Sequence, residues 1–274
     1  MKIQFIWCGK MWEVILQNLL QVEKKENIWV ETKTDVSKNN LAKKYWINIW
    51  VNLNENILRA PTGGAPTDII FLLIKPQQFK ELYFEKFWEN KIIFSFMAGI
   101  NVKKISEKLK TKKIIRAMPN TPMLVWKWVI WYFVNNNKDI INRHLYNNYE
   151  NYFRKIFSKN SSLIKCETED KIDKITALSG SGPAYYYFIT EILKQKAIEF
   201  WFSKKESENI ANNTFIWASK LLEKSQEKVE ILRKNITSKW WTTQKALETF
   251  EKNWFWEKFK EGIDEAYKRA KNLT

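Results

Sequence analysis

Residues 1–16 read Met1-Lys-Ile-Gln-Phe-Ile-Trp-Cys-Gly-Lys-Met-Trp-Glu-Val-Ile-Leu16, and this stretch decides the fold. The apolar run Ile3–Ile6 is typical of a short buried strand, and the apolar residues after Glu13 repeat at helical spacing. Residues 7–12 lie between the two and have the length of a dinucleotide-binding turn, G-x-G-x-x-G. Trp7 and Trp12 stand where this motif has its first and third glycines. As written, the turn has two indoles where the motif needs a tight turn and close helix packing.

The composition suggests an explanation for these tryptophans. The chain has 15 Trp and only 7 Gly in 274 residues, whereas glycine normally makes up about 7% of a protein. Trp240 and Trp241 lie in a Ser/Thr-rich loop, and Trp254 lies where one helix should end, so these positions also favour glycine. We hypothesise that most or all of the tryptophans are glycine in the cell, encoded by UGA in an organism that reads this codon as glycine. The alternative is a truly Trp-rich protein, and peptide mass spectrometry distinguishes the two.

Charge and composition argue against several classes of protein. The net charge is +16, but lysines are spread along the chain among acidic residues, so we expect no nucleic-acid binding. No apolar run approaches the roughly 20 residues of a membrane span, and no signal-peptide pattern precedes Ile3, which predicts a cytoplasmic protein. Cys8, Cys166 and His144 are the only cysteines and histidine, too few for a disulfide framework or a His-based zinc site or triad. We therefore expect no metal.

A second strand is predicted over Asn27–Thr34, and its end is where a Rossmann fold contacts the adenosine ribose. Thr32-Lys33-Thr34 close this strand, and hydroxyl and basic groups there suit a 2′-phosphate. We therefore favour NADPH as the cofactor. Glu31 keeps NADH possible, because an acidic residue at this place selects a free 2′-hydroxyl.

Three further apolar runs predict strands over Asp68–Lys75, Lys91–Met97 and Lys113–Met118. Strand and helix patterns alternate, which predicts an α/β fold with a Rossmann-like, doubly wound, mostly parallel sheet. Beyond residue 165 the apolar residues repeat only at helical spacing, and Ser203-Lys-Lys-Glu206 has the pattern of a capping box. We predict a Rossmann domain over 1–165 and an all-helical domain over 166–274.

With glycine in place of tryptophan, nearly the whole chain resembles pyrroline-5-carboxylate reductase. Six blocks in the same order carry the resemblance, and every tryptophan inside a block replaces a glycine of the family. The blocks are Phe5-Ile-Trp-Cys-Gly-Lys-Met-Trp12, Ile74-Lys75-Pro76-Gln77, Met97-Ala98-Gly99, Arg116-Ala-Met-Pro-Asn-Thr-Pro122, Thr176-Ala-Leu-Ser-Gly-Ser-Gly-Pro-Ala184 and Thr237-Ser-Lys-Trp-Trp-Thr-Thr243.

The resemblance implies reduction of 1-pyrroline-5-carboxylate to L-proline, by hydride transfer from NADPH or NADH to C5 of an electrophilic imine. No covalent nucleophile is needed, so the protein supplies mainly positioning. The helical domain would be a dimerisation domain, giving a homodimer or a higher homo-oligomer.

The resemblance also assigns cofactor-binding residues. The pyrophosphate would lie on the backbone of the turn, the 2′-phosphate at Lys33 and Thr34, the adenosine near Asn54 and the nicotinamide near Asn120. Two further strand ends would line the cofactor. The complete set is Ile6, Trp7, Cys8, Gly9, Lys10, Met11, Trp12, Lys33, Thr34, Asn54, Leu73, Ile74, Lys75, Pro76, Ala98, Gly99 and Asn120.

Two segments would hold the substrate. The loop Trp240, Trp241, Thr242 and Thr243 would bind the carboxylate, and Ser179, Gly180 and Ser181 would form the opposing wall. Thr243 is the candidate catalytic residue, as the hydroxyl nearest the ring nitrogen or the carboxylate. Simpler roles remain open, because threonines cap helices and serines permit close helix packing. The chain departs from the family at Lys239, where proline is frequent, and at Gln226, where an acidic residue sometimes lies.

Two other functions remain open. A β-hydroxyacid dehydrogenase shares this architecture but uses a catalytic lysine at the head of the interdomain helix, where Lys174 is the only nearby candidate. A non-catalytic Rossmann protein is the expectation if the tryptophans are literal, because the phosphate turn would then be blocked.

Overall fold

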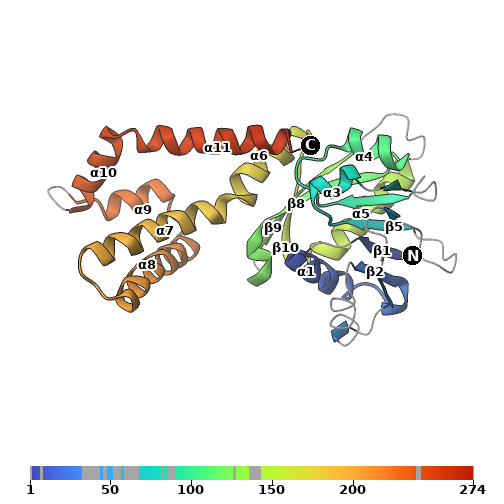
Figure 1. The fold of residues 1–274 in the computed structure, drawn as a ribbon, viewed down its shortest axis with the longest axis horizontal. Coiled ribbons are helices and arrows are strands. Elements are labelled where there is room, and N and C mark those ends of the chain that lie inside the picture. Colours follow the sequence, from blue (N-terminus) through green and yellow to red (C-terminus); the bar gives the residue numbers. More distant parts are fainter. Residues whose placement is uncertain are drawn as a thin grey trace. The chain divides into compact units, whose positions relative to one another are not determined.

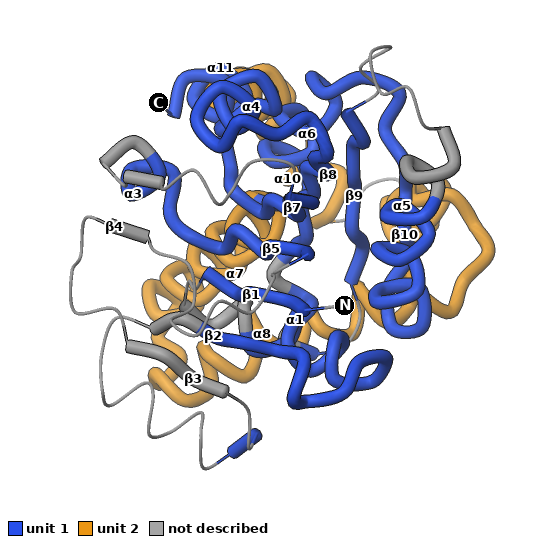
Figure 2. The backbone as a smooth tube through the Cα atoms, turned by 90° about the vertical axis from the view of Figure 1, so that its right-hand side faces the viewer, with its two compact units in different colours: residues 1–180, 267–274 blue, residues 181–266 orange. Residues whose placement is uncertain are grey.

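The computed structural model describes residues 2–6, 9–32, 44–45, 48–51, 57–58, 68–81, 83–84, 91–125, 128–135, 143–238 and 242–273. The chain forms two compact units (Figure 2). The first consists of Met1–Gly180 and Tyr267–Thr274, and the second of Ser181–Ala266. The last residues of the chain thus return to the N-terminal unit. The predicted boundary at 165/166 instead marks the end of the last strand, β10.

The first unit is built on a mostly parallel sheet, which confirms the predicted fold class (Figure 1). Among the described strands only β8 and β9 pair antiparallel. A separate small sheet pairs β4 (Ile57–Leu58) with β6 (Tyr83–Phe84). The order in the main sheet is β10 (Ser161–Lys165), β9 (Trp128–Val134), β8 (Ile114–Pro119), β7 (Ile92–Ser95), β5 (Ile69–Leu72), β1 (Ile3–Ile6), β2 (Ile28–Thr32), β3 (Asn48–Val51).

Helices cover both faces of this sheet. On one face, α1 (Gly9–Leu19) and α5 (Arg143–Phe157) pack on the side of the central strands that carries Phe5, Phe71 and Phe94. In this core the rings of Phe5 and Phe71 stack with centroids 4.5 Å apart, and Phe71 and Phe94 meet edge to face at 5.1 Å. On the other face, α3 (Pro76–Glu81) and α4 (Val102–Leu109) pack on the side that carries Ile6, Leu72 and Ile93. Alternate burial on two covered faces is what makes these strands apolar throughout.

The structure corrects some predicted boundaries. The strand predicted over Asp68–Lys75 ends at Leu72, because Pro76 begins α3 and its fixed φ suits the first helical residue. The strand predicted over Asn27–Thr34 covers Ile28–Thr32, and its last two positions lie outside the described residues. The sequence did not predict β10, whose residues are half-buried or exposed and lack a strict apolar alternation.

The second unit is helical, as predicted. It contains α7 (Gly182–Glu199), α8 (Lys204–Lys224), α9 (Val229–Asn235), α10 (Thr242–Lys252) and most of α11 (Phe255–Lys271). The predicted capping box is confirmed, because the Ser203 hydroxyl accepts from the Glu206 amide and the Glu206 carboxylate accepts from the Ser203 amide. The predicted break at the small-residue segment is also confirmed. There α6 (Asp170–Ile175) passes into a π-helical turn, Thr176–Gly180, before α7 begins.

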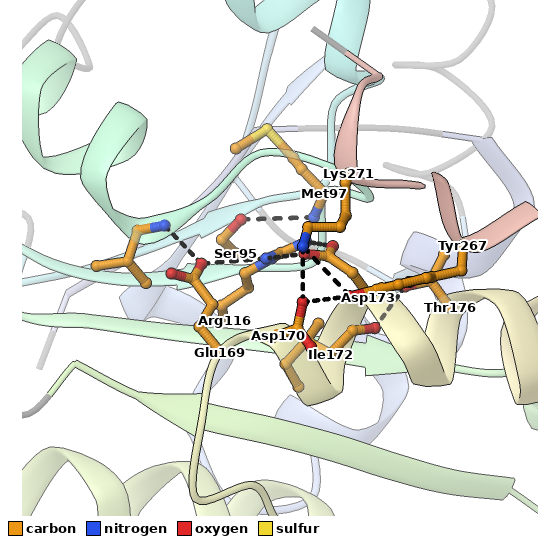
Figure 3. Close-up of polar contacts among 11 residues, drawn as sticks. Ser95, Met97, Arg116, Glu169, Asp170, Ile172, Asp173, Thr176, Tyr267 and Lys271 are labelled. Atoms are coloured by element: carbon orange, nitrogen blue, oxygen red, sulfur yellow. Dashed lines mark hydrogen bonds and ion pairs between the residues drawn. The ribbon is translucent and has the colours of Figure 1, made fainter. Parts of the chain in front are cut away.

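A buried ion-pair cluster fixes α6 to the sheet (Figure 3). Arg116 on β8 is fully buried, and its guanidinium donates to Asp173 at 2.5 Å and to Glu169 at 3.1 Å. The same Glu169 oxygen accepts the Val102 amide at 2.7 Å, at the N-terminus of α4. One guanidinium and two carboxylates therefore join β8, α4 and α6, and the helix N-terminus helps to compensate the extra negative charge.

Next to this cluster, the end of the chain is tied to α6. Asp170 accepts from the Tyr267 hydroxyl at 2.6 Å and pairs with Lys271 at 3.1 Å and Lys174 at 2.8 Å. Lys174 and Tyr267 hold the pKa of the Asp170 carboxyl well below its usual range. The contacts are partly exposed, so they locate the end of α11 more than they stabilise the fold.

We expect Arg116→Met to lower the free energy of unfolding by about 3–5 kcal/mol, because it leaves two carboxylates without their buried partner. Chemical denaturation measures this loss. The control is Lys103→Met, which removes an exposed helical ion pair with Glu107 and should change stability by less than about 1 kcal/mol. A loss for Arg116→Met no larger than that of the control would contradict the role of the cluster.

Candidate active site

The carboxyl ends of the parallel strands form the edge on which the cofactor residues were predicted. β1 lies between β5 and β2, so the direction in which successive strands are added reverses at β1 and β5. The Leu73 amide donates to the Ile6 carbonyl at 2.9 Å, and the Phe96 amide to the Leu72 carbonyl at 3.0 Å. Open α/β sheets bind ligands at such a reversal, beyond the carboxyl ends of the strands. Ile6 and Leu73 therefore lie where the sequence placed them.

The predicted segment Leu73–Pro76 follows β5 at this edge. Leu73 and Ile74 are buried, so they can offer a ligand their backbone rather than their side chains. Lys75 is exposed, and its amide donates to the Gln78 side chain at 3.1 Å as α3 begins. The segment joins the end of β5 to the start of α3. The same residues can therefore connect the two elements and also line the cofactor.

Ala98 and Gly99 form a turn after β7 that only glycine can complete. Gly99 has φ +69°, in the left-handed region. A Cβ there would lie 2.5 Å from the Leu273 Cβ and 2.7 Å from the Ala270 carbonyl oxygen. Ala270 and Leu273 near the end of the chain thus pack directly on the Gly99 turn and hold this turn in place at the carboxyl edge of the sheet.

Part of the dinucleotide turn lies outside the described residues. α1 begins at Gly9, within this turn and shortly after β1 ends at Ile6. Its N-terminal amides therefore face the same edge of the sheet. Such an end attracts phosphate. Gly9, Lys10, Met11 and Trp12 are therefore helical, as a turn that opens a helix requires. Predicted residues outside the described part of the chain are Trp7, Cys8, Lys33, Thr34, Asn54, Trp240 and Trp241.

Asn120 and Ser179 come together although they are far apart in the sequence. The Asn120 amide nitrogen donates to the Ser179 hydroxyl at 3.3 Å, and its carbonyl oxygen accepts the Val129 amide at 3.4 Å. Asn120 follows β8, and Ser179 and Gly180 lie in the π-helical turn. A residue predicted near the nicotinamide therefore meets residues predicted to form the substrate wall.

Ser181, Thr242 and Thr243 belong to the second unit. Ser181 precedes α7, and its carbonyl accepts the Ala184 amide at 2.9 Å. Thr242 and Thr243 are the first two residues of α10, and Thr243 is half-buried. Their positions agree with the simpler role left open for these threonines, which is to begin a helix. Their contact with a substrate stays a prediction.

Other chemistries find little support in the described part of the chain. It contains no group of three metal-binding side chains, and no helix in it is long and apolar enough to cross a membrane. Cys166 is buried, and burial raises the pKa of its thiol, which lowers its reactivity at neutral pH. Lys174 pairs with Asp170, which raises the pKa of its ammonium and so keeps it protonated. A general base needs the opposite shift.

Sequence reasoning assigned no role to the Arg116 cluster, which fixes the helix leading into the Ser179 turn. One signal was available, because a lone arginine inside an apolar strand requires a buried counter-charge. The sequence did not show which carboxylates would supply it.

Comparisons with known proteins agree with this arrangement. Residues 169–273 match the family described as pyrroline-5-carboxylate reductase dimerisation. The chain is 28% identical over 284 residues to the pyrroline-5-carboxylate reductase of Staphylococcus haemolyticus, covering 100% of this chain and 98% of the relative.

Two solved structures are similar over the same length. The pyrroline-5-carboxylate reductase of Coxiella burnetii is 26% identical, with a TM-score of 0.77 and coverage of 100% of this chain and 98% of the other. The Plasmodium falciparum pyrroline carboxylate reductase, with NADP bound, is 25% identical, with a TM-score of 0.75 and coverage of 99% and 97%. The chain is therefore similar to pyrroline-5-carboxylate reductases over nearly its whole length.

Proposed function

We propose that this chain reduces 1-pyrroline-5-carboxylate to L-proline with NADPH, the last step of proline biosynthesis. The observation that carries the proposal is the match in sequence and fold along nearly the whole chain. Within the structure, the contact between Asn120 and Ser179 supports it, because it joins the predicted nicotinamide and substrate segments.

The residues present fit a dinucleotide at the carboxyl edge. A helix N-terminus follows β1, backbone groups end β5, and Gly99 turns tightly after β7. Residues Ile6–Trp12, Leu73–Pro76, Ala98, Gly99 and Asn120 would hold the cofactor, with Lys33, Thr34 and Asn54 on its adenosine half. When bound, NADPH supplies the hydride.

The reaction asks little acid–base chemistry of the chain. A hydride adds to C5 of the imine, the C=N π electrons pass to the nitrogen, and that nitrogen takes up a proton from solvent to become an amine. Asn120 and Ser179 would orient the ring, and Thr243 would hold its carboxylate or nitrogen. Binding and orientation of two reactants account for most of the rate enhancement in such a site.

The second unit is proposed to form a homodimer. Its helices expose a large apolar surface that includes Tyr186, Tyr187 and Phe188 on α7 and Leu221 on α8, each at least 56% exposed. Exposed apolar surface of this extent marks an interface. The match to a dimerisation family over 169–273 supports a second copy as the occupant.

We also propose a cytoplasmic location, where a diffusible NADPH pool is at hand. Cell fractionation tests it, and recovery of the protein with the membranes would contradict it.

The β-hydroxyacid dehydrogenase alternative is weakened by Lys174, whose ammonium pairs with Asp170. A non-catalytic role would follow only from literal tryptophan at Trp7 and Trp12.

The function is tested on the chain expressed with glycine at the 15 Trp positions. We expect NADPH oxidation with 1-pyrroline-5-carboxylate, proline as the product, and slower turnover with NADH. β-Hydroxyacids with NADP⁺ serve as the control substrates and should give no reduction. A folded, dimeric protein without activity on 1-pyrroline-5-carboxylate would falsify the proposal.

We expect Asn120→Asp to lower kcat/KM on the order of 10²-fold, because it replaces the amide donor to Ser179 and misplaces the ring. Asn135→Asp is the matched control. Asn135 follows β9, which runs antiparallel to β8, so it lies at the opposite edge of the sheet. Equal losses in the two variants, measured in steady-state assays, would argue against a role for Asn120 in the site.

Thr243→Val removes the candidate catalytic hydroxyl. A role in carboxylate binding should appear mainly as a higher KM, whereas donation towards the ring nitrogen should lower kcat, on the order of 10²-fold. Thr249→Val on the same helix is the control, since its hydroxyl only bonds the Lys245 carbonyl at 2.8 Å. Unchanged kcat and KM in Thr243→Val would leave Thr243 with the simple role of a helix-start residue.

A further inference from the structure

The end of α7 has a backbone conformation that belongs to glycine. The Phe202 amide donates to the Ala197 carbonyl at 3.2 Å and the Trp201 amide to the Ile198 carbonyl at 3.0 Å. These two bonds define a Schellman motif, in which the residue at the position of Trp201 adopts the left-handed conformation. Trp201 has φ +69°, and its side chain is 95% exposed. The indole therefore gains little packing in return for a conformation that Cβ opposes.

The junction of α10 and α11 shares the left-handed residue and one of these two bonds. Trp254 has φ +58°, and its amide donates to the Glu251 carbonyl at 3.1 Å. Phe250 and Phe255 pack across the turn with ring centroids 5.5 Å apart, which is the hydrophobic contact that accompanies a Schellman end. Trp254 itself is 66% exposed. A second helix thus ends with tryptophan where glycine is the usual residue.

Left-handed backbone is concentrated at tryptophan in the described part of the chain. The non-glycine residues with positive φ there are Lys110, Trp201 and Trp254. For a bulky side chain such a φ is a genuine outlier. Tryptophan makes up 15 of 274 residues, so two of three positions is far above its share.

One buried tryptophan also lacks a partner for its indole nitrogen. Trp128 is buried, and its indole nitrogen has no hydrogen-bond partner, whereas a buried indole N–H normally has one.

We infer that Trp201 and Trp254 are glycine in the native protein, and with them Trp7 and Trp12 of the dinucleotide turn. By this inference one codon specifies all four positions and is read as glycine in the cell that makes this protein. The backbone at 201 and 254 supplies the argument independently of any likeness to a family. The inference goes beyond the proposed function. It also explains how a turn written with two tryptophans can accept a pyrophosphate.

Mass spectrometry of the protein isolated from its own cells tests the inference. Cleavage after lysine gives residues 197–204 with Trp201, 3–10 with Trp7 and 11–24 with Trp12. Residues 253–258 contain both Trp254 and Trp256, so fragmentation of this peptide assigns position 254. We expect glycine masses in all four peptides. Tryptophan at 201 or 254 overturns the inference. Neither result depends on whether the protein is an active reductase.

The backbone argument is tested by thermal unfolding of the all-glycine chain. A variant that retains only Trp201 should melt on the order of 2–4 °C lower, because Cβ opposes the left-handed conformation. A variant that retains only Trp217 is the control, since position 217 lies inside α8, where glycine is unfavourable, and it should melt no lower. Trp201→Ala in the first variant should recover little, as alanine keeps the Cβ. A melting temperature with Trp201 equal to that of the all-glycine chain overturns the argument.

Discussion

The buried pairing of Arg116 with Asp173 and Glu169 is the interaction on which the candidate site depends. It joins the strand that ends at Asn120 to the helix that leads into Ser179. Through Glu169 it also reaches the first turn of α4, which follows the Gly99 turn. Three segments of the carboxyl edge are therefore held by one guanidinium. Because the pair is buried, its removal would cost desolvation on the carboxylates that remain, not only the lost attraction.

Local periodicity was sufficient to predict the architecture, but not how every strand pairs. Ile69–Leu72 is apolar, so its strand character can be predicted, but the Lys-Pro pair that follows marks the start of α3 rather than the end of the strand. The β-branched and aromatic residues of β9 favour a strand but say nothing about its antiparallel direction. β10 has no such pattern and owes its strand to parallel pairing with β9. Strand direction and edge strands depend on tertiary contacts, which no local window contains.

The site divides in the same way. Residues at strand ends, such as Leu73 and Asn120, could be predicted because parallel strands bring their carboxyl ends to one edge. The partner of Asn120 lies 59 residues further on, and the partners of Arg116 lie 53 and 57 residues away. Their residue types were visible, but their pairing required the fold. Lys75 and Thr242 each lie at the start of a helix. The backbone groups at such a helix start are also the groups that would bind a ligand, so the structural role and the proposed binding role fall on the same residues.

Gly99, Trp201 and Trp254 all have a left-handed backbone, and comparing them indicates which residue is inserted at positions 201 and 254. At Gly99 a positive φ and a crowded neighbour both exclude a Cβ, and glycine is present. At Trp201 and Trp254 the backbone has the same left-handed conformation, here at helix ends, but the residue is the bulkiest of all. Folding energetics act on the residue that the ribosome inserts, not on the letter assigned to its codon. A helix end that requires φ near +60° therefore reports the inserted residue. With the same residue inserted at Trp7 and Trp12, the turn would be an intact phosphate-binding turn, in agreement with the proposed function.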